Sequence, residues 1–344
     1  MRDLKYIIAY LVPASTLLGL AWQGVWSWMT VALVFGILPV IELYTPKSIK
    51  NVPEAQENER SRRTFFDWLL YFNAPLLFGI VGWYLWLVST KTLSISETMG
   101  LTFGVGIVAG TCGINVAHEL GHRAKRMEQL LAQIMLLPTL YQHYFVEHNR
   151  GHHKNVATDE DPASARLGEN VFSFWLRSVS GGWRSAWALE RERLAKSGQP
   201  ASTWGNVMVR YSLYQTIWLL AIFFALGWQA LFGAIAVAII GFLLLETVNY
   251  IEHYGLRRKI LATGRPEPVS PRHSWNSDHE LGRIFLYELT RHSDHHFKST
   301  RKYQILRHLD ESPQLPYGYP TSIIMALLPP LWFRLMDKKA AQYP

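Results

Sequence analysis

Histidine is unevenly distributed in this sequence, and nine of its 13 histidines fall into four short groups. The groups are His118-Glu-Leu-Gly-His122, His148-Asn-Arg-Gly-His152-His153, the single His253, and His292-Ser-Asp-His295-His296. Side chains at i, i+3 and i+4 share a face of a helix. This spacing predicts that three sets of histidines each converge on an ion: His118 with His122, His148 with His152, and His292 with His295 and His296. Consecutive histidines point about 100° apart on a helix, so the doublet His152-His153 can serve two neighbouring ions.

The number of imidazoles favours two metal ions over one. Structural zinc prefers four ligands, commonly thiolates, and catalytic zinc needs only three protein ligands. Imidazole also suits iron, copper and nickel, so ligand type alone leaves copper and zinc open beside iron.

An acidic residue neighbours a histidine in each group. Metal-bound histidines usually donate their second N–H to a carboxylate or carbonyl, so these acids are candidates to orient the histidines or to bind metal directly. The alternative is that they are charged residues on solvated faces. The four acids are Glu119, Glu147, Glu252 and Asp294.

Other interpretations of the histidines are weaker. The first group matches the zinc-protease pattern H-E-x-x-H, in which the glutamate is a general base, but that pattern needs one further ligand and not seven. The remaining histidines lack partners at ligand spacing, and we interpret them as interfacial or supporting residues. They are His143, His273, His279 and His308.

The composition indicates a membrane protein. The chain is 49% hydrophobic and only 17% charged, whereas soluble domains carry about 25% charged residues. The net charge of +8 comes from basic residues in loops, without a stacking-aromatic stripe, which argues against nucleic acid as a partner. The single cysteine, Cys112, excludes an internal disulfide and a Cys₄ iron–sulfur or rubredoxin-type site, and we interpret it as a packing residue.

Apolar runs of about 20 residues predict an all-α polytopic membrane protein with about six transmembrane helices and a cytoplasmic histidine-rich helical domain. We expect one membrane-embedded catalytic domain over residues 1–344, with metal-binding parts at 118–206 and 251–344. Residues 127–144 and the proline-broken residues 323–335 are apolar but are predicted to be buried or interfacial. The predicted transmembrane helices are 4–21, 26–43, 66–88, 95–117, 207–226 and 230–250.

Two sequence features bear on the nature of the first apolar run and on the orientation of the chain in the membrane. Arg2 and Lys5 before the first apolar run could indicate a signal peptide, but no small-x-small cleavage site follows. Lysine and arginine concentrate after the second run, in residues 118–210 and beyond residue 250, whereas the other links are short and nearly uncharged. The positive-inside rule therefore places both termini and all four histidine groups in the cytoplasm.

With these motifs the sequence resembles the membrane alkane 1-monooxygenases (alkane ω-hydroxylases), part of the membrane di-iron histidine-box class that includes fatty-acyl desaturases. The long middle box Glu147-His-Asn-Arg-Gly-His-His153 and Asn249-Tyr-Ile-Glu-His-Tyr-Gly-Leu256 are typical of the alkane branch. Asp159-Glu-Asp-Pro-Ala-Ser164 and Tyr303-Gln-Ile-Leu-Arg-His308 resemble it too. The likeness extends to about residue 319, and Phe297-Lys-Ser-Thr300 departs from it where relatives often have a proline.

The resemblance implies a function. It implies two non-haem iron ions held by all nine grouped histidines, His253 included, with no catalytic residue beyond these ligands. It also implies hydroxylation of the terminal methyl of medium-chain n-alkanes with O₂, in the bacterial inner membrane. Electrons would come from rubredoxin and an NADH-dependent rubredoxin reductase.

The electron donor must be a separate protein, because the chain shows no Cys₄ site and no dinucleotide fingerprint. Rubredoxins tend to be acidic, so basic residues beside the histidine groups are candidates for docking, although positive-inside topology alone also explains them. These candidates are Arg150, Lys154, Arg291, Lys298, Arg301 and Lys302.

Three alternatives differ in what they require. A desaturase is disfavoured by the long middle box and by residues 249–256. A hydroxylase of aryl methyl groups shares more of these features. A metal transporter would need ionisable residues at bilayer depth, where Glu246 is the main example here.

Overall fold

The computed structural model describes residues 2–343, and the regular secondary structure of these residues is helical, as predicted. Among these residues, β-structure is limited to isolated bridges such as Lys47 with His279. The chain divides into two compact units. Unit 1 comprises Met1–Ile37, Phe65–Val146 and Ala186–Leu245, and unit 2 comprises Leu38–Thr64, Glu147–Ser185 and Glu246–Pro344.

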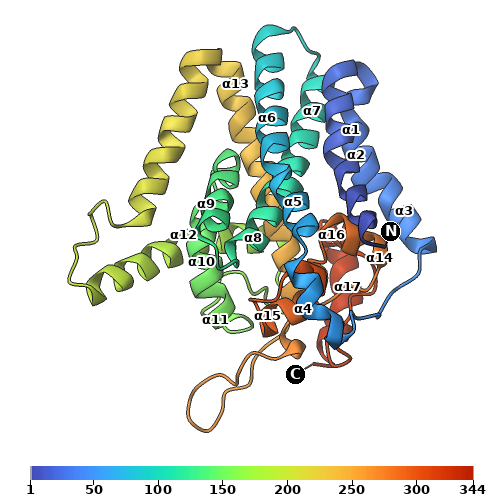
Figure 1. The fold of residues 1–344 in the computed structure, drawn as a ribbon, viewed down its shortest axis with the longest axis vertical. Coiled ribbons are helices and arrows are strands. Elements are labelled where there is room, and N and C mark those ends of the chain that lie inside the picture. Colours follow the sequence, from blue (N-terminus) through green and yellow to red (C-terminus); the bar gives the residue numbers. More distant parts are fainter. Residues whose placement is uncertain (1, 344) are drawn as a thin grey trace. The chain divides into compact units, whose positions relative to one another are not determined.

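Within residues 2–343, five helices are long and apolar enough to cross a membrane: Asp3–Trp22, Gly24–Tyr44, Thr64–Thr90, Ile95–Gly121 and Val207–His253. The last, α13, has 47 residues and is interrupted at Gly227, where φ is 79° and ψ is −171°. Figure 1 shows its two legs turning at this point. At 1.5 Å per residue, 47 residues would extend about 70 Å, roughly twice the hydrocarbon thickness. The two legs correspond to the fifth and sixth predicted transmembrane helices.

Unit 1 is built from the apolar helices. Its elements are η1 (Arg2–Tyr10), α1 (Leu11–Trp22), η2 (Gly24–Trp28), α2 (Met29–Ala32), η3 (Leu33–Ile37), α5 (Thr64–Tyr71), α6 (Asn73–Thr90), α7 (Ile95–Val108), η4 (Ala109–Ile114), α8 (Asn115–Gly121), α9 (Arg126–Met135), η5 (Leu137–Thr139), α10 (His143–Glu147), the last part of α12 (Val171–Lys196) and most of α13 (Val207–His253). Helices α1, α6 and α7 lie side by side (Figure 1). The apolar residues 127–144 form only short helices, as expected for a segment that does not span, since the ten residues of α9 cover about 15 Å.

Helix α7 lies at the centre of unit 1, and its sequence explains both its start and its packing. Ser94 and Glu97 form a capping box, in which the Glu97 N–H donates to Ser94 Oγ at 3.2 Å. A methyl group added at Gly100 would lie 2.8 Å from Ser27 Oγ, and one added at Gly110, in the π-helical turn η4 that continues α7, would lie 2.9 Å from Leu244 Cδ2. Small residues thus let neighbouring apolar helices approach closely, as is common in membranes.

Unit 2 consists of shorter helices joined by ordered loops. Its elements are α3 (Leu38–Tyr44), α4 (Glu54–Arg62), η6 (His148–His152), α11 (His153–Asn155), the first part of α12 (Val171–Lys196), the end of α13, η7 (Pro271–His273), α14 (Glu280–Phe285), α15 (His292–Phe297), η8 (Tyr303–Ile305), α16 (Tyr319–Ala326) and α17 (Pro329–Ala340). The apolar residues near the C-terminus are broken between α16 and α17, as their prolines predict. Large buried aromatics, among them Tyr250, Tyr254 and Trp332, form the core around the end of α13.

Candidate metal centre

Four histidines of unit 2 converge on one point. The Nε2 atoms of His296 and His292 are 2.9 Å apart, those of His292 and His253 are 3.1 Å apart, and those of His152 and His296 are 3.2 Å apart. Each histidine contributes one ligand atom to a set whose members all lie within 4.8 Å of one another. All four side chains are buried. We call this the four-histidine group.

Three elements position the four-histidine group. His292 and His296 occupy i and i+4 on α15, so both rings lie on one face of that helix. His253 is the last residue of α13, and His152 is the last residue of the π-helical turn η6. Residues far apart in the sequence therefore supply one set of nitrogens.

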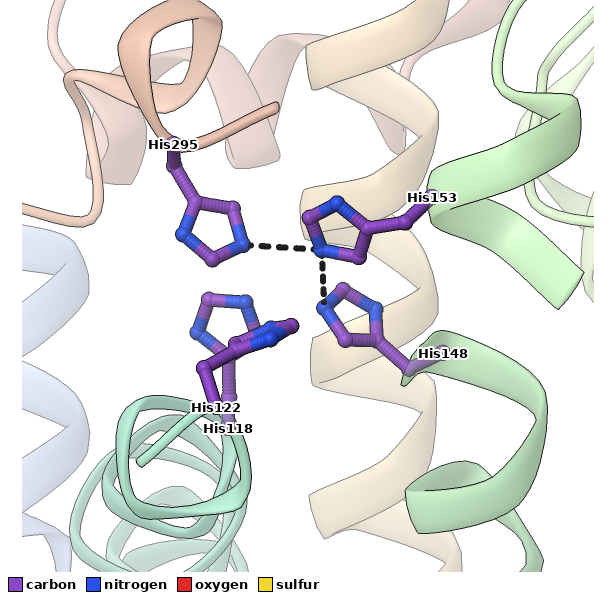
Figure 2. A group of neighbouring side chains, drawn as sticks. All are labelled: His118, His122, His148, His153 and His295. Atoms are coloured by element: carbon purple, nitrogen blue, oxygen red, sulfur yellow. Dashed lines mark hydrogen bonds between the residues drawn. The ribbon is translucent and has the colours of Figure 1, made fainter. Parts of the chain in front are cut away.

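A second set of histidines lies in the same unit. His153 Nε2 is 3.1 Å from His148 Nε2 and 3.1 Å from His295 Nε2, as the dashed lines in Figure 2 show. We call these three the three-histidine group. Figure 2 also draws His118 and His122 from the end of the fourth transmembrane helix, whose ring centroids are 5.1 Å apart.

The pairing differs from the prediction in two places. His148 was expected to share an ion with His152, but it lies with His153, because η6 is a π-helix, whose wider turn aligns residues i and i+5. His295 was expected beside His292 and His296, but it belongs to the three-histidine group. Each histidine doublet is thus divided between the two groups.

The donor set fits bound metal ions. Two nitrogens that bind one ion at right angles, each at about 2.1 Å, are about 3 Å apart, which is the spacing seen between these Nε2 atoms. Burial and the neighbouring histidines hold the pKa of His296 well below its usual value, so this imidazole is neutral. A neutral imidazole offers its Nε2 lone pair to a cation, and metal binding requires this deprotonated form.

Asp161 supports the four-histidine group from outside. Its carboxylate accepts a hydrogen bond from His152 Nδ1 at 2.9 Å, from the Ala163 N–H at 3.0 Å and from the Ser164 hydroxyl. A carboxylate on Nδ1 fixes the tautomer that leaves Nε2 as the ligand atom and makes that atom more basic. No spacing rule predicts a role for Asp161, although it lies within the run Asp159 to Ser164 that carries part of the family resemblance.

The four predicted acids have different partners. Glu252 Oε2 lies 3.2 Å from His292 Nε2, and its Oε1 accepts a hydrogen bond from the Tyr319 hydroxyl at 2.7 Å. Glu147 accepts a 3.4 Å hydrogen bond from Ser185, and burial followed by the charge of Asp161 raises its pKa to about 8.

The other two acids form ion pairs with arginines. Glu119 binds Arg123 at 2.7 Å, and Arg123 also binds Asp67 at 2.9 Å, all three being buried in unit 1. Asp294 binds Arg301 at 2.6 Å and accepts the Arg307 N–H at 2.8 Å. Both pairs hold elements that carry histidines.

Among the basic residues predicted to dock a redox partner, the prediction for Arg291 is wrong. It is buried, and its guanidinium donates to the carbonyl oxygens of Leu306 and Lys50, the latter at 2.8 Å. An arginine that satisfies buried backbone carbonyls cannot form a surface. Lys154 and Lys298 are exposed, and three candidates are partly exposed, namely Arg150, Arg301 and Lys302.

Comparison with known proteins agrees with this site. Residues 96–324 match the model of the family described as fatty acid desaturase. The chain is 39% identical over 328 residues to alkane 1-monooxygenase 2 of Pseudomonas aeruginosa, covering 95% of this chain and 87% of that protein. The chain belongs to the alkane 1-monooxygenase family.

Two further relatives are similar to this chain over nearly its whole length. The chain is 35% identical over 345 residues to alkane 1-monooxygenase of Pseudomonas putida, covering 98% of this chain and 85% of that protein. It is 28% identical over 344 residues to the xylene/toluene monooxygenase hydroxylase component of Pseudomonas putida, covering 98% and 89%. The protein is therefore a membrane enzyme of the alkane 1-monooxygenase family, with histidine groups suited to metal ions.

Proposed function

We propose that this protein hydroxylates the terminal methyl group of medium-chain n-alkanes to primary alcohols, with O₂ as co-substrate. The observation that carries the proposal is the convergence of buried imidazole Nε2 atoms at about 3 Å from one another, in a chain whose relatives are alkane 1-monooxygenases. The reaction consumes R–CH₃, O₂, two electrons and two protons, and yields R–CH₂OH and water.

The four-histidine group holds one ion and the three-histidine group binds the other, and the family resemblance implies that His118 and His122 are ligands as well. Three imidazoles leave a redox metal short of ligands, and His118 and His122 are the remaining histidines at ligand spacing in the sequence. Bound there, two iron ions would supply the redox chemistry that O₂ activation needs, which redox-inert zinc cannot supply.

The protein's own residues position and protect these groups. Asp161 holds the His152 ring in one orientation, and Glu252, itself held by Tyr319, contacts His292. Burial keeps a proton on the Glu147 carboxyl at neutral pH, because its pKa is about 8, so that no second full negative charge lies beside Asp161. Water is excluded because all four members of the four-histidine group are buried.

The substrate enters from the lipid, where an alkane concentrates and need not be exposed to water. The apolar helices hold its chain and present one end to the metal groups, so regioselectivity comes from positioning. The histidine groups lie on the cytoplasmic side of the inner membrane, because the basic loops that carry them are retained there.

Electrons come from rubredoxin, reduced by an NADH-dependent rubredoxin reductase. An acidic carrier would be attracted to exposed basic residues near the histidines, where Lys154 and Lys298 are the most accessible. Arg150, Arg301 and Lys302 are partly exposed and extend this surface. Loss of rate at high salt would be a property of such docking.

One reconstitution tests the proposal. Iron-loaded protein in nanodiscs is supplied with rubredoxin, its reductase, NADH, ¹⁸O₂ and octane, and the expected product is ¹⁸O-labelled 1-octanol. An alkene product, or a rate independent of iron, would overturn the proposal. Because one relative is named a xylene/toluene monooxygenase component, p-xylene in a parallel reaction tests the second candidate, a hydroxylase of aryl methyl groups. Faster turnover of p-xylene than of every n-alkane would favour that candidate.

A further inference from the structure

Helix α12 (Val171–Lys196) carries an apolar stripe whose side chains are largely exposed. Phe172 is 47% exposed, Leu176 is 78% exposed and Trp183 is 50% exposed, with half-buried Val179 between them. At 3.6 residues per turn, these four side chains fall within a sector of about 60°. We call them the α12 stripe.

A polar stripe that contains two arginines, which we call the basic stripe, runs beside the apolar one. Ser173, Ser180, Arg184 and Arg191 are all exposed, and they fall within a sector of about 40°, centred about 90° from the apolar stripe. A third face is buried, where Phe174 packs on Tyr250 with ring centroids 5.4 Å apart. The helix thus cannot rotate to bury its apolar stripe without breaking this packing.

The C-terminal part of α12 is fastened to the first turn of a membrane-spanning helix. Ala186, Trp187 and Leu189 pack around Val207, Met208 and Tyr211, where the first leg of α13 begins. The Val207 N–H donates to Glu190 Oε2 at 3.1 Å, and the same carboxylate oxygen binds Arg193 at 2.8 Å. This end of α12 therefore lies at the level where the chain enters the membrane.

We propose that α12 lies along the membrane surface, with its apolar stripe among the acyl chains and its basic stripe at the phosphates of anionic lipids. Its apolar, basic and buried faces have the arrangement of an interfacial helix, and tryptophan prefers this depth. Arg184 and Arg191 carry the sign that anionic lipid headgroups attract. The attachment to the first turn of α13 supplies the depth, and for this reason the occupant is lipid and not a second protein.

Nitroxide labels at adjacent positions test the proposal. Cys112 is first replaced by serine, and the background variant is accepted if its unfolding temperature matches wild type. Phe172→Cys and Ser173→Cys are then labelled, because these neighbours point about 100° apart at the same place along the helix. In nanodiscs containing anionic lipid, the ratio of collisions with O₂ to collisions with a water-soluble nickel chelate should be about fivefold higher at 172 than at 173.

Two results would overturn the proposal. Equal access of the nickel chelate to both labels would mean that the stripe faces water. Shielding of label 172 from both O₂ and nickel would mean that a protein surface covers it, either a second copy or a partner.

The basic stripe is tested by lipid composition. Raising phosphatidylglycerol from none to about a quarter of the lipid should increase the contrast between labels about twofold. The double variant Arg184→Gln with Arg191→Gln should not show this increase in contrast. The matched control is Lys196→Gln, which removes a lysine already paired with Glu192 at 2.7 Å. This control variant should still show the increase. A double variant that behaves like the control contradicts the role of the basic stripe.

Discussion

The two histidine groups of unit 2 use the same ligand type at the same spacing, yet their surroundings differ. Every member of the four-histidine group is buried, and two carboxylates, Asp161 and Glu252, touch its rings. In the three-histidine group, His153 is partly exposed. The four-histidine group is therefore sealed and touched by two carboxylates, whereas one ligand of the three-histidine group remains partly accessible to solvent.

The cause of the difference is where the ligands come from. The four-histidine group combines the end of α13, one face of α15 and the end of η6, so the core of unit 2 closes around it. His153 begins the short helix α11, which leads into a loop at Asp159 and Glu160 that is exposed. A ligand on such an edge retains access to solvent.

The largest expected effect comes from removing a ligand of the sealed group. His253→Ala should lower iron content by about one ion per chain and reduce octane hydroxylation at least about 100-fold, since the remaining imidazoles cannot replace a buried ligand. Metal analysis and product chromatography measure both. The control is His308→Ala, which removes a histidine paired with Asp278 and should retain both ions. Normal iron and activity in His253→Ala would remove His253 from the ligand set.

A smaller effect is expected from the carboxylate behind His152. Asp161→Asn keeps the shape but weakens the acceptor on Nδ1, so iron affinity or turnover should fall about 10- to 100-fold. Asp159→Asn is the matched control, because that carboxylate is exposed and lies 3.6 Å from Arg257. Titration of iron into the apo proteins separates the two variants. Equal affinities in both would mean that Asp161 supports only the loop.

The sequence alone was sufficient for the membrane architecture and for the set of grouped histidines. Bilayer thickness sets the length of an apolar run, so the positions of the five candidate spans were predictable, including the interruption of the longest one at Gly227. Eight of the nine histidines stand out because their spacing is local, whereas the single His253 was included only through the family resemblance.

The division of the histidines between groups was predictable only in part. The 100° step of a helix separates His152 from His153, but the partners of His148 and His295 depend on the backbone. A π-helical turn at η6 moves His148 from His152 to His153, and no residue type in His148-Asn-Arg-Gly-His152 announces that turn. Asp161 was missed because it reaches His152 through a loop, and loop conformation is set by tertiary hydrogen bonds such as that of Ala157 N–H to Ser164 Oγ. The burial of Arg291 was not predicted, because a charged side chain is expected at the protein surface.

Removal of iron by a chelator distinguishes the two histidine groups by their rates of release. With a membrane-impermeant iron chelator, release should occur in two phases, and the faster should be about tenfold quicker because one ligand of its group is partly exposed. His153→Ala should remove the fast phase, whereas His253→Ala should remove the slow one. Absorbance of the iron–chelate complex follows the release. A single phase in the wild-type protein would mean that exposure does not distinguish the groups.

The smallest effect is expected at Tyr319, whose hydroxyl donates to Glu252 at 2.7 Å while the other oxygen of Glu252 touches His292. Tyr319→Phe removes one buried hydrogen bond and should cost about 1 kcal/mol of stability. If Tyr319 positions Glu252, the slow phase of iron release should also quicken about threefold, since Glu252 lies 3.2 Å from the His292 ligand atom, where its carboxylate can face the bound ion. Tyr254→Phe is the matched control, because its hydroxyl donates at 2.6 Å to Asp337 and not to an acid beside a histidine. Both variants should lower the unfolding temperature, but only Tyr319→Phe should change iron release. An unchanged slow phase in Tyr319→Phe would show that the hydroxyl serves packing alone, and that the sealed group owes its stability to burial and Asp161.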